Sequence, residues 1–354
     1  MSCRRKIPNL PIDIVNSILL DLPVKSLLRF KITCKSWCCF IDDGYFINSH
    51  LHRSSTDINL LSIEGSISTD SKVVLLNELY LPGFDSIHYF EVRSCGGLVF
   101  ITYLKSKNMI LWNPIIRKYK LIPKLQKKDC FHVWTIYGFA YDVVAEDYKV
   151  LCVHDIVNKN TTDKCYIVEI YSIKNQSWRT IPNIFSVCAD FVLLRNYKPV
   201  SLNGVIYFMA FKRENLNDCV VSFHLVDEKF IVMSMPYKCR DLLSRLNLRI
   251  FGDRFCIMGT FDKEFLIWSL EKDWKTWNNI TRFPTLGMIG YYGSDVICIK
   301  ENGNILCRMD GGRFIEYNVR KNGYTKFEVK EFPPSVKIGR LYVESLASLK
   351  ISWD

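Results

Sequence analysis

The 354-residue sequence contains no apolar run that approaches the ~18 residues needed to cross a lipid bilayer. Its first residues, MSCRRKIPNLP, also lack the apolar stretch that defines a secretory signal peptide. Both absences argue against the membrane-spanning and secreted classes of protein. We therefore expect a soluble chain of the cytoplasm, the nucleus or both, without a membrane partner.

A pairing motif for its cysteines is also missing. The 14 cysteines are spread along the chain without any C-x-x-C pair. Several of them, including Cys152, Cys256 and Cys298, stand inside apolar runs of strand length. Reduced cysteines behave as small buried hydrophobes in such runs, so the sequence does not predict a disulfide scaffold.

The sequence lacks the common catalytic motifs, namely G-x-S-x-G, the P-loop, the dinucleotide fingerprint and H-E-x-x-H. His50 and His52 have no further metal ligands nearby in sequence, and we interpret them as exposed residues at a helix end. The carboxylates Asp142, Glu146 and Asp147 in DVVAEDYKV are typical of a turn between two strands. We therefore predict no catalytic residue, no metal and no cofactor.

Basic residues exceed acidic ones, 47 against 36, which gives a formal charge of +11. The densest basic run consists of Arg117, Lys118, Lys120, Lys124, Lys127 and Lys128. Apolar residues interrupt this run at strand spacing and it contains no nucleic-acid motif, so a solvated turn is the favoured interpretation. A patch that attracts an acidic protein is the alternative, and a nucleic-acid partner is not expected.

Residues 7–46 have the apolar periodicity of short helices. Pro23 should end the first helix and start the second, and a third short helix should end at Asp42, Asp43 and Gly44. Helices shorter than ~12 residues do not persist alone in water, so packing must hold them together. The stretch also has more large apolar residues than so small a core can hide, which predicts that another protein covers some of them.

The wording of this stretch, with Leu10-Pro11, then ILLDLPVKSLLRFK and then CKSW, resembles the F-box of plant proteins. The F-box is the motif that docks on Skp1-like subunits of cullin-RING ubiquitin ligases. The resemblance implies a helical-core or Skp1-binding role for Leu10, Pro11, Ile14, Ile18, Leu19, Leu22, Pro23, Leu27, Phe30 and Trp37. Among them we expect Leu10, Pro11, Leu22, Pro23 and Leu27 to form the docking patch. The alternative is a helical cap on the domain that follows.

A change of pattern divides the chain into residues 1–53 and residues 54–354. Ser54, Ser55 and Thr56 are typical of a linker, and beyond them the sequence consists of short apolar runs separated by turn residues. We therefore predict a small all-α module followed by an all-β domain with a closed or repeated architecture.

Paired aromatic residues repeat through the β domain. Seven residues separate Trp112 from Tyr119, Tyr171 from Trp178, Phe223 from Phe230 and Tyr317 from Tyr324, while Trp268 precedes Trp274 and Trp277. Intervals of roughly 45 to 59 residues between the first aromatics are typical of propeller blades. We expect these aromatics to stack between neighbouring blades. Five blades, and a sixth closed from residues 58–81 and 341–353, predict a six-bladed propeller; a β-sandwich is the competing architecture.

The β half resembles the F-box-associated domain of plant F-box proteins, which is similar to kelch propellers. The resemblance rests on motifs in the family's order, among them CGGLVF, LWNPIIRKYKLIP, YGFAYDVVAEDYKVL and LIWSLEKDWKTW. The set is also similar to the S-locus F-box proteins of self-incompatibility.

Together the two resemblances imply a non-catalytic substrate-recognition subunit of an SCF (Skp1-cullin-F-box) E3 ubiquitin ligase. The F-box would bind a Skp1-like protein, and through it the cullin and RING subunits, while the propeller would hold an unidentified target protein. Target specificity would lie in the loops 124–134, 157–164, 185–198 and 237–248. The alternatives are an F-box scaffold that builds no ligase and a propeller that binds carbohydrate.

Overall fold

The computed structural model describes most of the chain from Pro11 onward. The described residues are 11–53, 58–62, 73–75, 90–103, 107–124, 132–157, 164–182, 190–236, 246–261, 264–271, 273, 275–284, 295–300, 302–308, 314–327, 339–343 and 345–346. Within these residues four helices come first and 24 strands follow, as the sequence pattern predicts for an α module and a β domain. No described helix has the length and apolarity to cross a membrane.

Prolines set the start of the first two helices, α1 (Ile12–Leu20) and α2 (Val24–Lys31). Pro11 and Pro23 stand at the N-cap positions, where the missing N–H of proline costs no helical hydrogen bond. The Pro11 carbonyl oxygen accepts from the Ile14 amide at 3.0 Å, and the Pro23 carbonyl oxygen accepts from the Ser26 amide at 2.9 Å. The predicted role of Pro23 between the two helices is confirmed.

The third helix, α3 (Lys35–Ile41), is followed by a fourth, α4 (Gly44–Arg53), which the sequence interpretation did not include. Asp43 starts this helix, because its Oδ1 accepts from the amides of Tyr45 at 3.0 Å and Phe46 at 3.2 Å. Asp42, Asp43 and Gly44 therefore separate two helices rather than closing the module.

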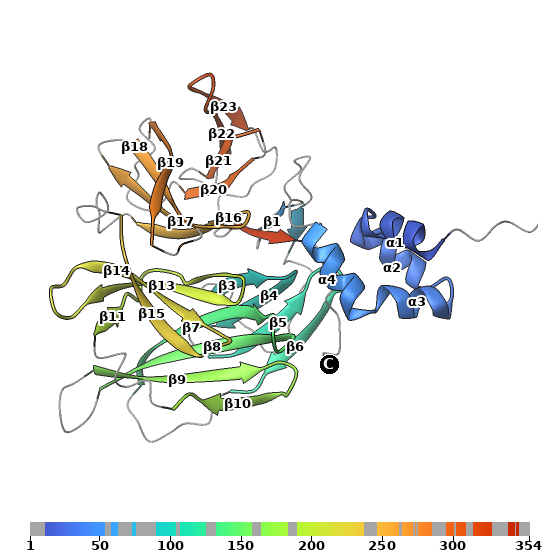
Figure 1. Ribbon diagram of the computed structural model, residues 1–354, viewed down its shortest axis with the longest axis horizontal. Helices are drawn as coiled ribbons and strands as arrows, with labels where there is room; N and C mark the ends of the chain where they lie inside the picture. The colour runs from blue at the N-terminus through green and yellow to red at the C-terminus, as the bar shows by residue number, and fades with distance from the viewer. Residues whose placement is uncertain are drawn as a thin grey trace, which may run out of the picture.

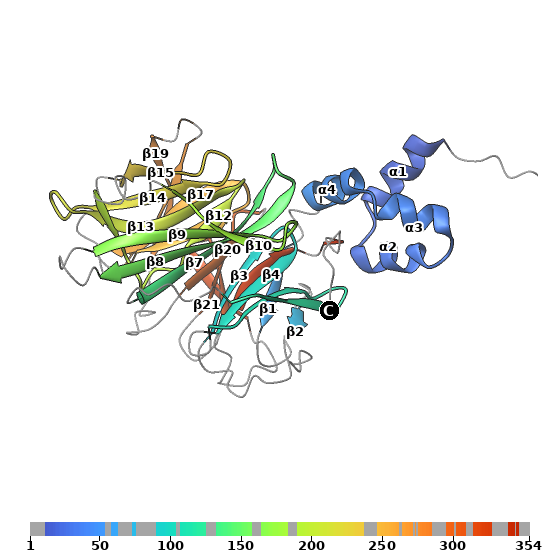
Figure 2. The ribbon, with the colours of Figure 1, turned by 90° about the horizontal axis from the view of Figure 1, so that it is seen from below.

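The core of the helical module includes one residue from the far end of the chain. Leu346, near the C-terminus, is buried in the same cluster as the buried side chains of α1 to α4, and Ile115 packs against that cluster. The other buried members are Leu19, Val24, Leu27, Ile41, Phe46 and Ile47. The β domain thus completes one side of the helical core. Figures 1 and 2 show the helices together at one side of the β domain.

Five antiparallel sheets form blades in sequence order. Blade 1 has β3 (Phe90–Cys95), β4 (Leu98–Tyr103), β5 (Met109–Asn113) and β6 (Lys118–Ile122), and blade 2 has β7 (His132–Asp142), β8 (Asp147–Val157), β9 (Lys164–Ser172) and β10 (Ser177–Thr180). Blade 3 has β11 (Phe191–Leu193), β12 (Val200–Leu202), β13 (Val205–Lys212), β14 (Asp218–His224) and β15 (Lys229–Ser234). Blade 4 has β16 (Asn247–Phe251), β17 (Arg254–Phe261), β18 (Glu264–Leu270) and β19 (Trp277–Pro284), and blade 5 has β20 (Asp295–Ile299), β21 (Ile305–Arg308), β22 (Phe314–Asn318) and β23 (Gly323–Phe327).

A three-stranded sheet joins the two ends of the β domain. Its strands are β1 (Ile58–Ser62), β2 (Val73–Leu75) and β24 (Gly339–Val343). The predicted pairing of the first strand with the last is confirmed, since β1 and β24 run antiparallel with Ile58 opposite Val343. The predicted sixth blade is wrong: β2 pairs with β1 in parallel, and in the described residues this sheet lacks the four-stranded antiparallel order of the five blades. The kelch-like class stays a prediction.

The seven-residue aromatic spacing corresponds to direct partners across a hairpin. Trp112 lies opposite Tyr119, Tyr171 opposite Trp178, Phe223 opposite Phe230 and Tyr317 opposite Tyr324. In blade 4 the register shifts between Ile267 and Trp268, which places Trp268 opposite Asn279 and explains the altered spacing. Both partners of a pair belong to one blade, and the expected packing between blades is also present: Tyr171 and Trp178 of blade 2 lie in one cluster with Phe100 of blade 1, and Tyr317 of blade 5 stacks on Phe283 of blade 4.

Hydrogen bonds from the fourth strand of a blade make the link to the blade before it. Trp178 Nε1 donates to the Pro123 carbonyl oxygen at 2.8 Å, and Trp277 Nε1 donates to the Ser234 carbonyl oxygen at 2.9 Å. The Tyr324 hydroxyl donates likewise to the carbonyl oxygen of Pro284. Each bond joins the end of one blade to an outer strand of the next.

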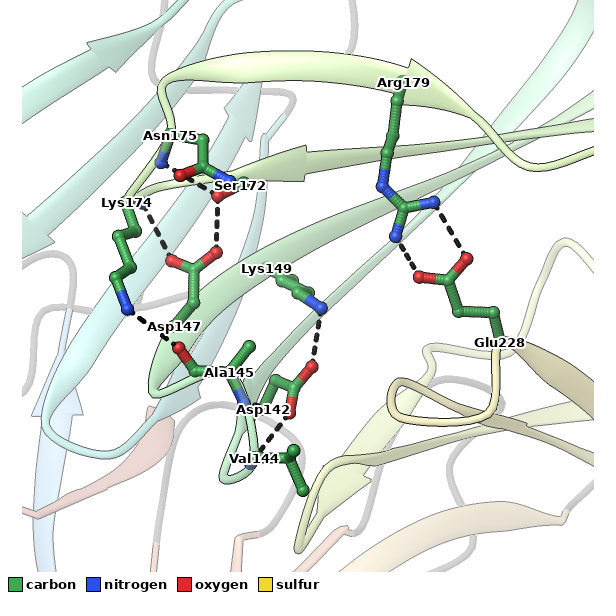
Figure 3. Close-up of polar contacts among 10 residues, drawn as sticks. All are labelled: Asp142, Val144, Ala145, Asp147, Lys149, Ser172, Lys174, Asn175, Arg179 and Glu228. Atoms are coloured by element: carbon green, nitrogen blue, oxygen red, sulfur yellow. Dashed lines mark hydrogen bonds and ion pairs between the residues drawn. The ribbon is translucent and has the colours of Figure 1, made fainter.

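Blade 3 has Phe230 at the equivalent position, and phenylalanine cannot donate such a bond. An ion pair between Arg179 of blade 2 and Glu228 of blade 3 links these two blades instead (Figure 3).

Candidate docking surface

Large apolar side chains remain exposed on the helical module. Ile14 is 47% exposed and Ile18, one turn later on α1, is 50% exposed. Ile12 at the start of α1, Phe30 on α2 and Ile32 just after α2 are also exposed. We call Ile12, Ile14, Ile18, Phe30 and Ile32 the exposed apolar set of the module. Aliphatic and aromatic surface of this kind favours burial against another protein.

The remaining sequence-predicted residues adjoin this set. Pro11 and Pro23 are exposed, and Leu22 and Trp37 are half-buried. The Phe30 ring stacks on the Trp37 ring with centroids 5.5 Å apart, so the half-buried Trp37 packs against an exposed member of the set. Their role in docking stays a prediction.

Two of the predicted residues belong to the core instead. Leu27 is 0% exposed and Leu19 is 2% exposed, because they lie on the helix faces that pack against α3 and α4. The expectation that Leu27 contributes surface to the docking patch is therefore corrected. Leu10 lies outside the described residues.

His50 was expected to be an exposed helix-end residue, and this expectation is wrong. Its side chain is 2% exposed, and its Nε2 donates to the carbonyl oxygen of Leu22 at 2.8 Å. The bond fixes α4 to the connection between α1 and α2, where Leu22 and Pro23 lie. A signal for this role exists in the sequence, since His50 follows the buried Phe46 by four residues on one face of α4. The side chain of His52 lies outside the described residues.

The contact between the helical module and the β domain, which we call the Leu346 joint, is closely packed around Leu346 and Ser345. Asn113, at the end of β5, is fully buried and donates through Nδ2 to the Ser345 carbonyl oxygen at 3.3 Å. Gly97 has a φ of +77°, and a Cβ there would lie 1.9 Å from the Cβ of Ser345. This fit holds Leu346 in place next to the helices.

The carboxylates of the β7–β8 turn have structural roles, as the sequence predicts (Figure 3). Asp142 Oδ1 accepts from the amides of Val144 and Ala145 at 3.0 Å, and its Oδ2 accepts from Lys149 Nζ at 2.6 Å. Burial acts to raise the pKa of Asp142, but the hydrogen bond from Lys149 lowers it overall. Asp147 Oδ1 accepts from the Lys174 amide at 2.8 Å. These bonds hold a turn.

Among the residues that the structure describes, no three His, Cys, Asp or Glu side chains are grouped to hold a metal ion. Cys152 and Cys256 are buried and free, as expected of small hydrophobes, and the side chain of Cys298 is outside the described part.

The basic run of blade 1 divides between surface and interior. Arg117, Lys118 and Lys124 are exposed, which agrees with a solvated turn. Lys120 is buried, so that interpretation is wrong at this position because its strand β6 alternates between the two faces of the sheet. Lys127 and Lys128 lie outside the described residues.

Comparison with known proteins agrees with this division of the chain. Residues 45–349 match the F-box associated beta propeller domain, and residues 7–48 match the F-box domain. This chain belongs to the F-box-associated beta propeller family. The match over residues 7–48 also shows that the helical module is an F-box and more than a cap on the β domain.

Two curated relatives come from Arabidopsis thaliana. An F-box protein is 29% identical over 274 residues, covering 75% of this chain and 70% of the relative. The F-box/WD-40 repeat-containing protein 1 is 30% identical over 232 residues, covering 62% of this chain and 54% of the relative. F-box proteins are in general non-catalytic adaptors, and an F-box in general binds a Skp1-like partner.

Proposed function

We propose that this F-box protein is the substrate-recognition subunit of an SCF E3 ubiquitin ligase. Its F-box docks on a Skp1-like protein, which connects it to the cullin and RING subunits, and its propeller holds a target protein for ubiquitination. The observation that carries the proposal is the pair Ile14 and Ile18, which stay half-exposed on α1 while Leu346 of the β domain fills the opposite, core side of the helices.

The mechanism is proximity. A target bound to the propeller and a ubiquitin-charged E2 bound to the same assembly meet at a raised effective concentration, so the transfer no longer depends on a bimolecular encounter. The adaptor needs a defined geometry for this role, and the burial of Leu346 in the helical cluster supports such a geometry between F-box and propeller.

Docking draws its energy from apolar burial. Covering a half-exposed isoleucine removes enough apolar surface to contribute about 1 kcal/mol at ~25 cal/mol per Å². The exposed apolar set has four isoleucines and one phenylalanine, and a few well-packed anchors among them would dominate binding.

Co-purification with a Skp1-like protein and a cullin tests the proposal. We expect the Ile14→Ala/Ile18→Ala variant to lose most of the Skp1-like protein. The matched control is Leu121→Ala/Ile231→Ala, which truncates two equally exposed aliphatic residues on outer strands of the propeller. Equal retention in both variants would argue against docking through α1. Retention of the Skp1-like protein without cullin, or an unchanged half-life of bound targets, would indicate a scaffold in place of a ligase.

A further inference from the structure

An exposed tryptophan stands at the start of the innermost strand of blade 2. Trp134 on β7 is 45% exposed, and the Arg195 guanidinium carbon lies 5.9 Å from its ring centroid. Arg195 comes from blade 3, in the segment between β11 and β12. A cation over an indole face is a favourable pairing, so the two blades hold a flat ring and a charge together.

A buried carboxylate fixes the arginine. Arg195 Nη2 donates to Asp155 Oδ2 at 2.7 Å, and Asp155 on β8 is 6% exposed. The second oxygen, Oδ1, is buried with no hydrogen-bond partner among the described residues. The negative charge of the buried Asp155 carboxylate is therefore stabilised by its ion pair with Arg195. Trp134, Arg195 and Asp155 are thereby ordered before any ligand binds, which lowers the entropic cost of binding.

Arg195 keeps binding capacity after pairing with Asp155. A guanidinium has five N–H donors in a planar fork, and the bond to Asp155 uses one of them. About a third of the side chain is exposed. The described part of the chain gives no second carboxylate to this arginine, so an incoming carboxylate can take the free edge.

The two residues lie at the edge of the propeller away from the F-box. The Tyr148 hydroxyl, just after the β7–β8 turn, donates to the Gly96 carbonyl oxygen in the β3–β4 turn at 2.9 Å, so these turns share an edge. The β5–β6 turn lies at that edge as well, because β5 runs parallel to β3, and its Ile115 packs against the F-box core. Trp134 is at the other end of β7. A ligand there does not compete with a partner of the F-box.

The exposed Trp134 and Arg195 and the positive charge of the chain favour an acidic protein as the partner at this edge. Tryptophan and arginine are the residues that most often dominate the energy of protein interfaces. The chain carries a charge of +11, and the segment that leads into β7, residues 123–131, has three lysines and one acidic residue in sequence. A positive field of this kind attracts and orients acidic partners.

We propose that Trp134 and Arg195 form the anchor for an acidic segment of the target protein. An apolar or aromatic side chain of the segment packs on the exposed Trp134 ring, and a neighbouring carboxylate accepts from the free N–H edge of Arg195. This inference rests on the proposed function in that it names the chemistry of the target that the propeller holds.

Fluorescence anisotropy with the full-length chain tests the anchor. The probes are three labelled twelve-residue peptides, one alternating Glu and Phe, one alternating Glu and Ser, and one alternating Lys and Phe. We expect the Glu-Phe peptide to bind most tightly and its affinity to fall with added salt. The variants Trp134→Ala and Arg195→Gln should each weaken its binding at least about tenfold, which is ~1.4 kcal/mol.

The control variants are Arg320→Gln, which removes an exposed arginine of blade 5, and Tyr45→Ala, which removes an exposed aromatic of the F-box. Both should bind the Glu-Phe peptide as the unmodified chain does. Unchanged affinity in Trp134→Ala and Arg195→Gln, equal binding of the Lys-Phe peptide, or no peptide binding at all would overturn the proposal. The assay contains no Skp1-like protein, so failure of the anchor is distinguishable from failure of F-box docking, which co-purification measures.

Discussion

The indole Nε1 of Trp178 lies 2.8 Å from the carbonyl oxygen of Pro123, so an outer strand of blade 2 is bonded to the end of blade 1. The arrangement recurs between later blades through Trp277 and Tyr324. In two of these three bonds the acceptor is the carbonyl oxygen of a proline at or just after the end of an outer strand, Pro123 or Pro284, and in the third it is the carbonyl oxygen of Ser234.

Removing one of these bonds should weaken the propeller. We expect Trp178→Phe to lower the free energy of unfolding by about 1 kcal/mol, since the Pro123 carbonyl oxygen loses its donor. Trp134→Phe is the control, because Trp134 is 45% exposed and the same change there removes little buried volume. Thermal unfolding checks this prediction: a fall in Tm of a few degrees for Trp178→Phe alone agrees with it, and equal Tm values contradict it.

His50 should couple α4 to the docking surface. We expect His50→Ala to destabilise the F-box by about 2 kcal/mol, because the change leaves a cavity and an unpaired Leu22 carbonyl. Binding of the Skp1-like protein should weaken as Leu22 and Pro23 lose their support. Tyr45→Ala, on the exposed face of the same helix, should leave binding unchanged. Pull-down at matched protein concentrations measures both variants, and equal recovery would refute the role of His50.

Leu346 should make the stability of the F-box depend on the propeller. Its buried side chain fills the helical cluster, so Leu346→Ala should cost about 2–4 kcal/mol and raise amide hydrogen exchange in α1 and α4. Val319→Ala, a half-exposed position in the β22–β23 turn, is the control. Unchanged exchange in the helices of the Leu346 variant would show that the F-box folds without the joint.

Asp218 should give the propeller a pH dependence. Burial raises the pKa of this carboxyl to about 6, and its Oδ2 has no hydrogen-bond partner among the described residues. The folded state holds this proton to a higher pH than the unfolded state does. The contribution of Asp218 to the free energy of unfolding is therefore complete below pH ~4 and is lost as the pH rises through about 6.

The Asp218→Asn variant should therefore gain stability at pH 7 relative to pH 4. The gain is about 1 kcal/mol after allowance for solvent screening of this half-exposed group. Asp253→Asn, at an exposed carboxylate in the β16–β17 turn, is the comparison. Chemical unfolding at both pH values decides the matter, and a pH dependence in Asp218→Asn identical to that of the original chain would disprove the assignment.

Hairpin pairing and the starts of the first two helices could be predicted from the sequence, because residues close together in the chain determine them. The seven-residue aromatic spacing gave the hairpins because a short turn places those residues directly opposite each other, as Trp112 and Tyr119 show. Helix starts followed from Pro11 and Pro23. The helix at Gly44 escaped prediction because glycine normally ends a helix, and the cap that overrides it comes from Asp43.

Long-range packing explains the remaining differences. Nothing near Leu346 in sequence indicates that it belongs to the core of helices some 300 residues earlier in the chain. Arg195 likewise meets Trp134 and Asp155 only because blades 2 and 3 are adjacent. Of the predicted docking residues, Leu19 and Leu27 were not separable from the exposed set, since all of them are apolar and only the tertiary packing decides which face is covered.

The most direct measurement of the central claim is calorimetric titration of the full-length chain with a purified Skp1-like protein. We expect binding by the original chain and at least a ~100-fold loss in Ile14→Asp/Ile18→Asp, since two charges would enter an apolar interface at a cost above ~3 kcal/mol. Trp134→Ala should bind the Skp1-like protein with unchanged affinity. Equal affinity of the Ile14→Asp/Ile18→Asp variant and the original chain would contradict docking through α1.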